Sequence, residues 1–197
     1  MYSRSLPHWH PLFLTWRLFG GLPRRTPKIE RESQEAITGK NAGKEFVLMD
    51  RALDRATRGP KWLSDHSVAE CVVRAFVYGA AVLRHYDLCA YVVMSNHVHL
   101  LIRPNVQVPR ITQRIKTASA REANRIWGRT GSYFWQDESF DHWAREPTEY
   151  ERIRRYIENN PVAAELVDKE EDWRWSSASV EDRPMPSDRG CSCVAVA

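Results

Sequence analysis

The sequence predicts an α+β fold, a split β-α-β sheet that carries helices on one face. Two observations predict it. Short apolar runs rich in aromatic and β-branched residues predict strands, and longer segments with apolar residues every three or four positions predict helices. The order along the chain is strand, helix, strand-turn-strand, helix and strand, which is the order of that sheet, and one more helix follows it.

The first strand is expected at residues 13–19 and is closed by Gly20 and Gly21. From about residue 22 to 45 the chain becomes polar and rich in turn-forming residues, so we interpret this part as a flexible insertion. Residues 46–57 have helical spacing and end shortly before a Gly-Pro pair, which predicts a helix there.

A longer helix is expected from about residue 64 to 84. Ser64 or Asp65 can cap its first turn. Apolar residues recur at helical spacing and form the stripe that we expect to be buried, namely Val68, Val72, Ala75, Phe76, Gly79 and Leu83.

Two adjoining strands occupy residues 91–104, with a turn at residues 95–96. The second strand carries His97 and His99 on either side of Val98. Because side chains alternate between the faces of a strand, the two imidazoles point the same way, about 7 Å apart along the chain, and Val98 enters the core. The pair can bind one ion, although two ordinary histidines on a half-exposed strand are the alternative for an isolated His-x-His.

A second His-x-His, His8 and His10, lies between Pro7 and Pro11. Prolines on both sides disfavour a regular strand, so these histidines are expected in a loop or at the entry of a strand. We therefore keep this pair only as the weaker candidate for a metal site.

A helix from about residue 109 to 127 is predicted by an apolar stripe of Ile111, Ile115, Ala118 and Ile126. Beside the stripe, four arginines fall within an arc of about 60°. They are Arg110, Arg114, Arg121 and Arg125. A stripe of one sign indicates phosphate binding, and a solvated charged face is the alternative.

The aromatic residues 133–143 predict a strand or a rigid turn, and Pro147 then begins the last helix. This helix is expected to end near Asn160, because the residue before Pro161 is disfavoured in the α conformation. Its apolar stripe consists of Tyr150, Ile153, Tyr156 and Ile157. Tyr156 and Asn160 are one turn apart and share a face.

If that face meets the strand with the two histidines, a phenol, an amide oxygen and two imidazoles converge. Such a set suits phosphodiester chemistry, in which a divalent ion polarises the phosphate and the Tyr156 oxygen attacks phosphorus. Two nitrogens and an amide oxygen with open positions suit Mg²⁺ or Mn²⁺ better than structural zinc. For Tyr156 considered alone, a core tyrosine is the alternative.

Three motifs in this order resemble the single-tyrosine HUH transposases (IS200-like transposases), in the branch called REP-associated tyrosine transposases. They are MSNHVHLL at residues 94–101, WQDESFDH at residues 135–142 and YIENNPV at residues 156–162. The resemblance runs from about residue 8 to 176 and leaves out part of the insertion. Glu165 stands where the family has a glycine in its Asn-Pro-Val-x-Ala-Gly-Leu run.

The resemblance implies a ferredoxin-like (RRM-like) antiparallel sheet and metal-dependent nicking and joining of single-stranded DNA at hairpin-forming repeats, through a covalent 5′-phosphotyrosine. By position, His97 and His99 match the metal ligands and Tyr156 the nucleophile. Asn160 matches the third ligand, which is a glutamine in the insertion-sequence relatives. The DNA-binding residues that we expect are the four arginines above together with Trp135, Gln136 and His142.

A length of 197 residues predicts one catalytic domain, residues 1–180, followed by a loose tail, residues 181–197, that is rich in proline, serine and charge. The net charge of +4 permits a nucleic-acid partner. No apolar run has the length of a membrane span, so we expect a cytoplasmic protein with no membrane partner. Cys71 and Cys89 are expected as reduced core residues, and the sequence leaves monomer or dimer open.

Two other classes of function remain as alternatives. One is a domesticated, non-catalytic DNA-hairpin-binding protein on the same scaffold. The other is a metal hydrolase that uses water as its nucleophile. Against the non-catalytic binder, an intact Tyr156 together with both histidines favours the enzyme, and Tyr156→Phe would distinguish the hydrolase from the transposase.

Overall fold

The structure, a computed structural model, describes residues 10–20 and 59–179 of the chain. The predictions for His8, for the polar insertion, for the helix after it and for the C-terminal tail concern residues outside this part. The regular elements are β1 (Leu12–Arg17), η1 (Trp62–Ser64), α3 (His66–Ala81), β2 (Tyr86–Val93), β3 (His97–Pro104), α4 (Val108–Ile126), β4 (Phe140–Trp143), α5 (Pro147–Ala163) and η2 (Glu170–Asp172).

The four strands form one sheet in the order β2-β3-β1-β4, and every neighbouring pair is antiparallel. This order and direction confirm the predicted ferredoxin-like sheet. The histidine strand β3 is internal, between β2 and β1, and His99 lies opposite Thr15 in the register.

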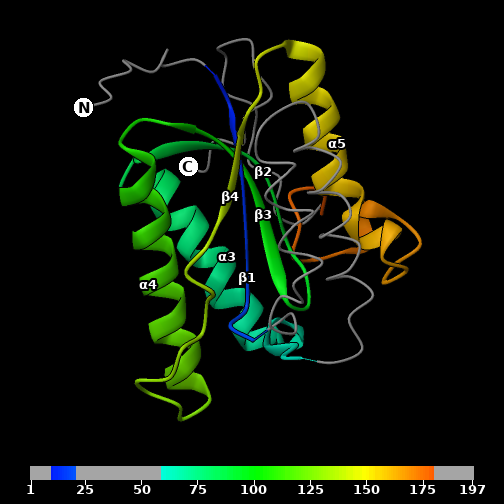
Figure 1. Cartoon of the computed structure of the whole chain (residues 1–197). Helices are drawn as coiled ribbons and strands as arrows, with labels where there is room; N and C mark the ends of the chain where they lie inside the picture. Colours follow the sequence, from blue (N-terminus) through cyan, green and yellow to red (C-terminus); the bar gives the residue numbers. More distant parts are fainter. Residues whose placement is uncertain (1–9, 21–58, 180–197) are drawn as a thin grey trace, which may run out of the picture.

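Helices α3 and α4 pack against each other and cover one face of the sheet (Figure 1). The alternate β3 residues Val98, Leu100 and Ile102 enter the core on this face. Asp65 caps α3 by accepting a hydrogen bond from the Ser67 backbone N–H, as one of the two predicted caps.

The predicted stripe of α4 is wrong at one position, because Ala118 is exposed and Ser119 is buried in its place. The Ser119 hydroxyl donates to the Ile115 carbonyl at 2.7 Å and accepts a hydrogen bond from Trp135 Nε1 at 2.9 Å. A small polar side chain can be buried when its hydrogen bonds are made inside the protein, so Ser119 occupies the packed face at little cost.

Helix α5 packs on the opposite face, against β2 and β3 (Figure 1). Its residues Tyr150 and Ile157 are buried with Phe13 and Leu101, which point away from the α3–α4 layer. The last helix therefore lies beside the histidine face, as the sequence requires for the predicted site.

The end of α5 differs from its prediction, since the helix continues through Pro161 to Ala163. Beyond the proline, the Leu166 N–H donates to the Pro161 carbonyl at 2.9 Å and the Glu165 N–H donates to the Val162 carbonyl at 3.0 Å. These two hydrogen bonds, together with the φ of 57° at Glu165, form a Schellman motif at the C-terminus of the helix. These hydrogen bonds outweigh the tendency of the residue before a proline to avoid the α conformation.

The segment after η2 returns to the outer edge of β2. The Val93 N–H donates to the Trp175 carbonyl, the Ser177 N–H donates to the Tyr91 carbonyl, and Ser176 forms a bridge with Val92. Within the described residues, no helix is long and apolar enough to cross a membrane. Cys71 and Cys89 are both buried, which confirms the predicted core position of each.

Candidate active site

His97 and His99 project from β3 on the side of α5, and neither side chain is exposed to solvent (0% each). Their Nε2 atoms lie 3.2 Å apart. The two imidazoles therefore converge on one point, as the alternation of the strand predicts, while Val98 between them is in the core on the other face.

Neighbouring side chains fix both rings. The Nδ1 atom of His97 lies 2.7 Å from Asn96 Oδ1, in the turn that joins β2 to β3. The ring of His99 stacks on Phe13 of β1, with centroids 5.6 Å apart and an interplanar angle of 28°. Side chains that are held in this way have little rotamer freedom left to lose when they bind a ligand.

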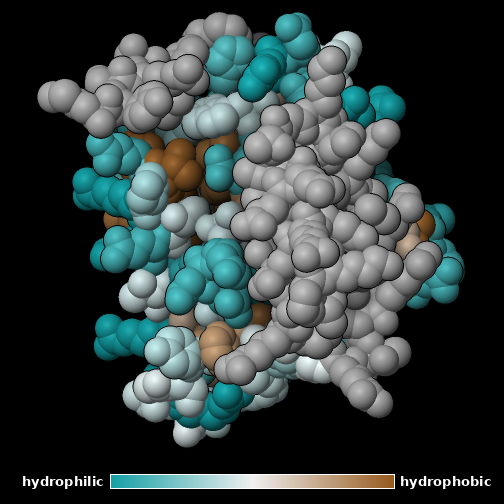
Figure 2. Space-filling view, in the orientation of Figure 1, coloured by the Kyte–Doolittle hydropathy of each residue, from teal (hydrophilic) through white to brown (hydrophobic). Residues whose placement is uncertain are grey.

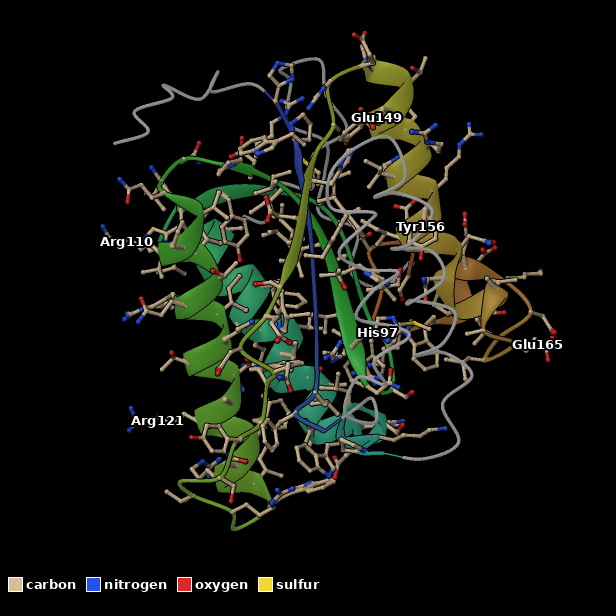
Figure 3. The ribbon with its side chains drawn as sticks, viewed as in Figure 1. His97, Arg110, Arg121, Glu149, Tyr156 and Glu165 are labelled. Atoms are coloured by element: carbon tan, nitrogen blue, oxygen red, sulfur yellow. The ribbon has the colours of Figure 1, made fainter. Side chains whose placement is uncertain are left out.

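Helix α5, which packs against β2 and β3, carries both Tyr156 and Asn160; Tyr156 is labelled in Figure 3. Asn160 is 3% exposed, and its amide Nδ2 lies 3.4 Å from His99 Nε2. The Tyr156 ring is half-buried, 5.8 Å from the His99 ring and 6.4 Å from the Phe13 ring, centroid to centroid. The four predicted catalytic and metal-binding residues are thus neighbours.

These donors fit a divalent ion. With metal–nitrogen bonds of about 2.1 Å, two nitrogens that are 3.2 Å apart subtend an angle of about 100° at the ion, which is close to adjacent octahedral positions. A 180° turn of the Asn160 amide puts its oxygen on the same side as the His99 Nε2 atom. Two imidazoles and one amide are three donors, so they would leave positions for water or substrate. Among the described residues, no group of three or more His, Cys, Asp or Glu could hold a metal ion.

Beside α5 there is an open hollow of about 550 Å³, which Tyr156 and Asn160 help to line. Its charged lining includes Arg154, whose guanidinium pairs with Glu158 at 2.5 Å and with Glu151 at 3.1 Å. This arginine is therefore engaged along α5, and the tyrosine one turn before it, Tyr150, is buried against the sheet. Tyr156 is the more accessible of the two tyrosines on this helix.

The predicted arginine stripe lies on the other side of the molecule. Figure 3 shows Arg110 and Arg121 projecting from α4, away from Tyr156 and His97. All four arginines of the stripe are exposed, and the α4 side of the face in Figure 2 is mostly hydrophilic. Arg125 forms an ion pair with Glu122 at 2.7 Å.

Two members of the stripe, Arg114 and Arg121, line a hollow of about 470 Å³ between α3 and α4. Helix α3 adds Arg74 and the exposed Tyr78 to this hollow, residues that the sequence-based reasoning missed. No local pattern indicates them, because their position follows from the packing of α3 against α4.

The second motif, residues 135–142, contributes to the structure in a different way from the one predicted. Trp135 is only 5% exposed and its Nε1–H donates to Ser119, so its ring belongs to the core and cannot stack on a base in this conformation. Gln136 is half-buried at the start of the following loop. Lys116 Nζ donates to the carbonyls of Gln136 and Asp137 at 3.0 Å each, which ties this loop to α4.

His142 on β4 lies with its Nε2 atom 2.8 Å from Glu149 Oε1 at the start of α5. Partial burial raises the pKa of Glu149, but hydrogen bonds from the Arg145 N–H and from His142 outweigh it, and the net pKa is below the usual value. The side chain of His142 is 43% exposed and remains accessible to a ligand.

The fold and this site define a class of protein, a ferredoxin-like domain with a buried His-x-His on an internal strand and a tyrosine on the helix that faces it. Residues 61–160, more than half of the chain, match the family described as "Transposase IS200 like", and the chain belongs to this family. The family-level resemblance of the motifs is thereby confirmed.

One solved structure supports the fold, and a second adds only a further similarity. A REP-associated tyrosine transposase bound to a REP hairpin superimposes with a TM-score of 0.55 at 17% sequence identity, over 100% of this chain and 90% of that chain. A putative transposase from Deinococcus radiodurans has a TM-score of 0.33 at 16% identity, over 81% of this chain and 97% of that chain. No curated protein matches the sequence.

Proposed function

We propose that this protein is a REP-associated tyrosine transposase, which nicks and joins single-stranded DNA at hairpin-forming repeats through a covalent link between Tyr156 and a 5′ phosphate. The single observation that carries the proposal is the convergence of Tyr156, His97, His99 and Asn160 on one side of the sheet. Neither a hairpin-binding protein without catalysis nor a hydrolase that uses water needs a tyrosine beside this donor set.

In the reaction, the Tyr156 hydroxyl loses its proton and its oxygen attacks the scissile phosphorus. A new Tyr156–phosphorus bond forms as the bond from phosphorus to the 3′ oxygen breaks, and the leaving oxygen takes up a proton to give a 3′ hydroxyl. Joining is the reverse attack by a 3′ hydroxyl. No oxidant or other co-reactant is needed.

His97 Nε2, His99 Nε2 and Asn160 Oδ1 would hold a divalent ion such as Mg²⁺ or Mn²⁺, which would supply the polarisation of the phosphate. The protein's own residues orient the reacting groups. Phe13 contacts both the His99 ring and the Tyr156 ring, so it keeps the nucleophile beside the imidazoles and excludes water beneath them. Asn160, one turn after Tyr156, keeps α5 in register with β3.

We further propose that DNA follows the surface from α4 to α5. In the sheet order, β4 is the edge strand opposite β2, and it runs between α4 and α5 in Figure 1. Phosphates would contact the arginine stripe of α4, and the strand would then cross β4 near His142 before it reaches Tyr156. Gln136 would approach a base, with Trp135 anchoring its loop in the core.

A covalent trap tests the proposal. The purified protein is mixed with Mn²⁺ and a pool of single-stranded hairpin oligonucleotides with randomised stems and flanks, labelled at the 3′ end. We expect a labelled protein–DNA adduct that resists denaturation, a released fragment with a 3′ hydroxyl, and no adduct when a chelator removes the ion. Mass spectrometry should place the DNA on Tyr156.

Variants of the two tyrosines decide the mechanism. Tyr156→Phe removes only the attacking oxygen, so it should abolish the adduct while hairpin affinity stays within a few-fold. Tyr150→Phe is the matched control and should retain the adduct. Cleavage that survives Tyr156→Phe would establish the hydrolase instead, and hairpin binding by the wild type without any cleavage would establish the non-catalytic binder.

A further inference from the structure

Asn96 is the second residue of the turn between β2 and β3, and its side chain is 2% exposed. Its backbone carbonyl accepts a hydrogen bond from the Leu18 N–H at 2.8 Å, which fixes the main chain of the turn to the residue after β1. Its side-chain Oδ1 lies 2.7 Å from His97 Nδ1. Both ends of Asn96 are therefore held in place, and the side chain is aimed at the ring of His97.

The chemistry of this bond determines where His97 carries its hydrogen. An amide oxygen only accepts hydrogen bonds, so the ring must donate from Nδ1. A neutral imidazole has one ring hydrogen, and with that hydrogen on Nδ1 the other nitrogen, Nε2, presents a lone pair. That lone pair points to His99 Nε2, at 3.2 Å.

The same reasoning extends to the other two residues of the site. Two lone pairs that face each other at 3.2 Å repel, so without an ion the hydrogen between the rings must be on His99 Nε2. The Asn160 Nδ2 atom lies 3.4 Å from that nitrogen, and after the 180° turn of the amide described above its Oδ1 can accept the same hydrogen. One hydrogen of His99 thus occupies the place among the three atoms that a shared ion would take.

We infer that Asn96 is a positioning residue for the metal site, because it holds His97 as the Nδ1–H tautomer and so directs the Nε2 lone pair to the ion. This inference rests on the proposed metal-dependent function. Without the Asn96 oxygen, His97 can place its hydrogen on Nε2, and a ring in that state cannot bind metal through that nitrogen. Partners that set the tautomer of a ligating histidine in this way typically change metal affinity by about 10- to 100-fold.

The test uses ¹⁵N-labelled, metal-free protein. Long-range ¹H–¹⁵N spectra distinguish a ring nitrogen that carries hydrogen from one that does not. In the wild type we expect hydrogen on His97 Nδ1 and none on Nε2. Asn96→Leu has a similar volume but no acceptor, and Asn96→Asp retains an acceptor oxygen at the same place.

We expect Asn96→Leu to show a mixture of His97 tautomers and to bind Mn²⁺ about 10- to 100-fold more weakly in titration calorimetry. Asn96→Asp should keep the wild-type tautomer and bind Mn²⁺ at least as tightly. Neither Ser95 nor Asn96 has a positive φ, so the turn accepts these side chains. Asn105→Leu, in the exposed loop after β3, is the matched control and should leave both measurements unchanged.

A wild-type His97 with its hydrogen on Nε2 would overturn the inference, even if every Asn96 variant failed to fold. An Asn96→Leu protein with the wild-type tautomer and Mn²⁺ affinity would overturn it as well. The tautomer is measured without DNA. A protein with the expected tautomers but no Tyr156 adduct would therefore refute the proposed reaction and support the role of Asn96.

Discussion

Glu165 occupies the left-handed backbone position that ends α5, and its replacement by glycine should stabilise the protein. Its φ is 57°, which lies in the region that side chains with a Cβ disfavour. The conformation costs roughly 1–2 kcal/mol for a residue other than glycine. Glycine also has more conformational freedom in the unfolded chain, which lowers the free energy of unfolding by about 0.4–1 kcal/mol. The net increase in the free energy of unfolding should therefore be about 0.5–1 kcal/mol.

The charge of Glu165 adds a separate effect that must be removed from the comparison. A carboxylate near the negative end of a helix is unfavourable by about 0.3–1 kcal/mol, and both Glu165→Gly and Glu165→Ala relieve it. Only glycine also removes the backbone strain at this position. Glu165→Gly should therefore exceed Glu165→Ala by about 0.5–1 kcal/mol in the free energy of unfolding, measured by urea denaturation.

A thermal scan gives an independent measurement. For a protein of this size, 1 kcal/mol corresponds to about 2–4 °C in Tm, so glycine should melt about 1–4 °C above alanine at position 165. Ala164→Gly, at φ −88°, is the matched control and should lower stability, because that residue has no strain to relieve. Equal gains from Glu165→Gly and Glu165→Ala would refute the reasoning, since charge alone would then account for both.

Two further predictions concern the DNA surface and the N-terminal cap of α3. Arg114→Ala and Arg121→Ala should each weaken hairpin binding for all sequences alike and reduce the salt slope by about one unit in anisotropy titrations. The exposed Arg174, beside the edge strand β2 on the opposite side of the sheet from β4, supplies the control Arg174→Ala, which should leave both unchanged. A sequence-dependent loss would contradict the phosphate role. Asp65 accepts a hydrogen bond from Trp127, which with the Ser67 bond holds the pKa of this carboxyl below its usual value. The charged Asp65 carboxylate therefore stabilises the protein fully above its pKa in the unfolded chain, and this stabilisation is lost as the pH falls through its pKa in the folded protein. The Tm difference between wild type and Asp65→Asn should shrink below about pH 4. A Tm difference that stays constant with pH would show that the Asp65 charge is not its cause.

The elements that carry the site could be predicted because their signals are periodic. The alternation around Val98 places His97 and His99 on one face whatever the rest of the chain does, and the one-turn spacing of Tyr156 and Asn160 places them on one face of a helix. The sequence alone could not establish that these two faces meet. The contact depends on the packing of α5 against β2 and β3, which is tertiary.

The errors have the same origin. Ala118 is more apolar than Ser119, but the partner that makes Ser119 suitable for burial is Trp135, 16 residues away along the chain. The same bond places the Trp135 ring in the core, although an aromatic residue in a polar motif is equally typical of a base-stacking surface. The preference of the residue before a proline predicted that α5 ends near Asn160, but hydrogen bonds formed by residues after Pro161 extend the helix.

The return of residues 175–177 to β2 also bears on how copies of the chain can associate. An exposed edge strand offers unpaired N–H and carbonyl groups, onto which another chain can add a strand. From Tyr91 to Val93 those groups are already bonded to the Trp175 carbonyl and to the backbone and side chain of Ser177. The part of β2 that leads into the histidine turn is therefore closed to strand addition by a second copy, because residues 175–177 of the same chain already occupy it.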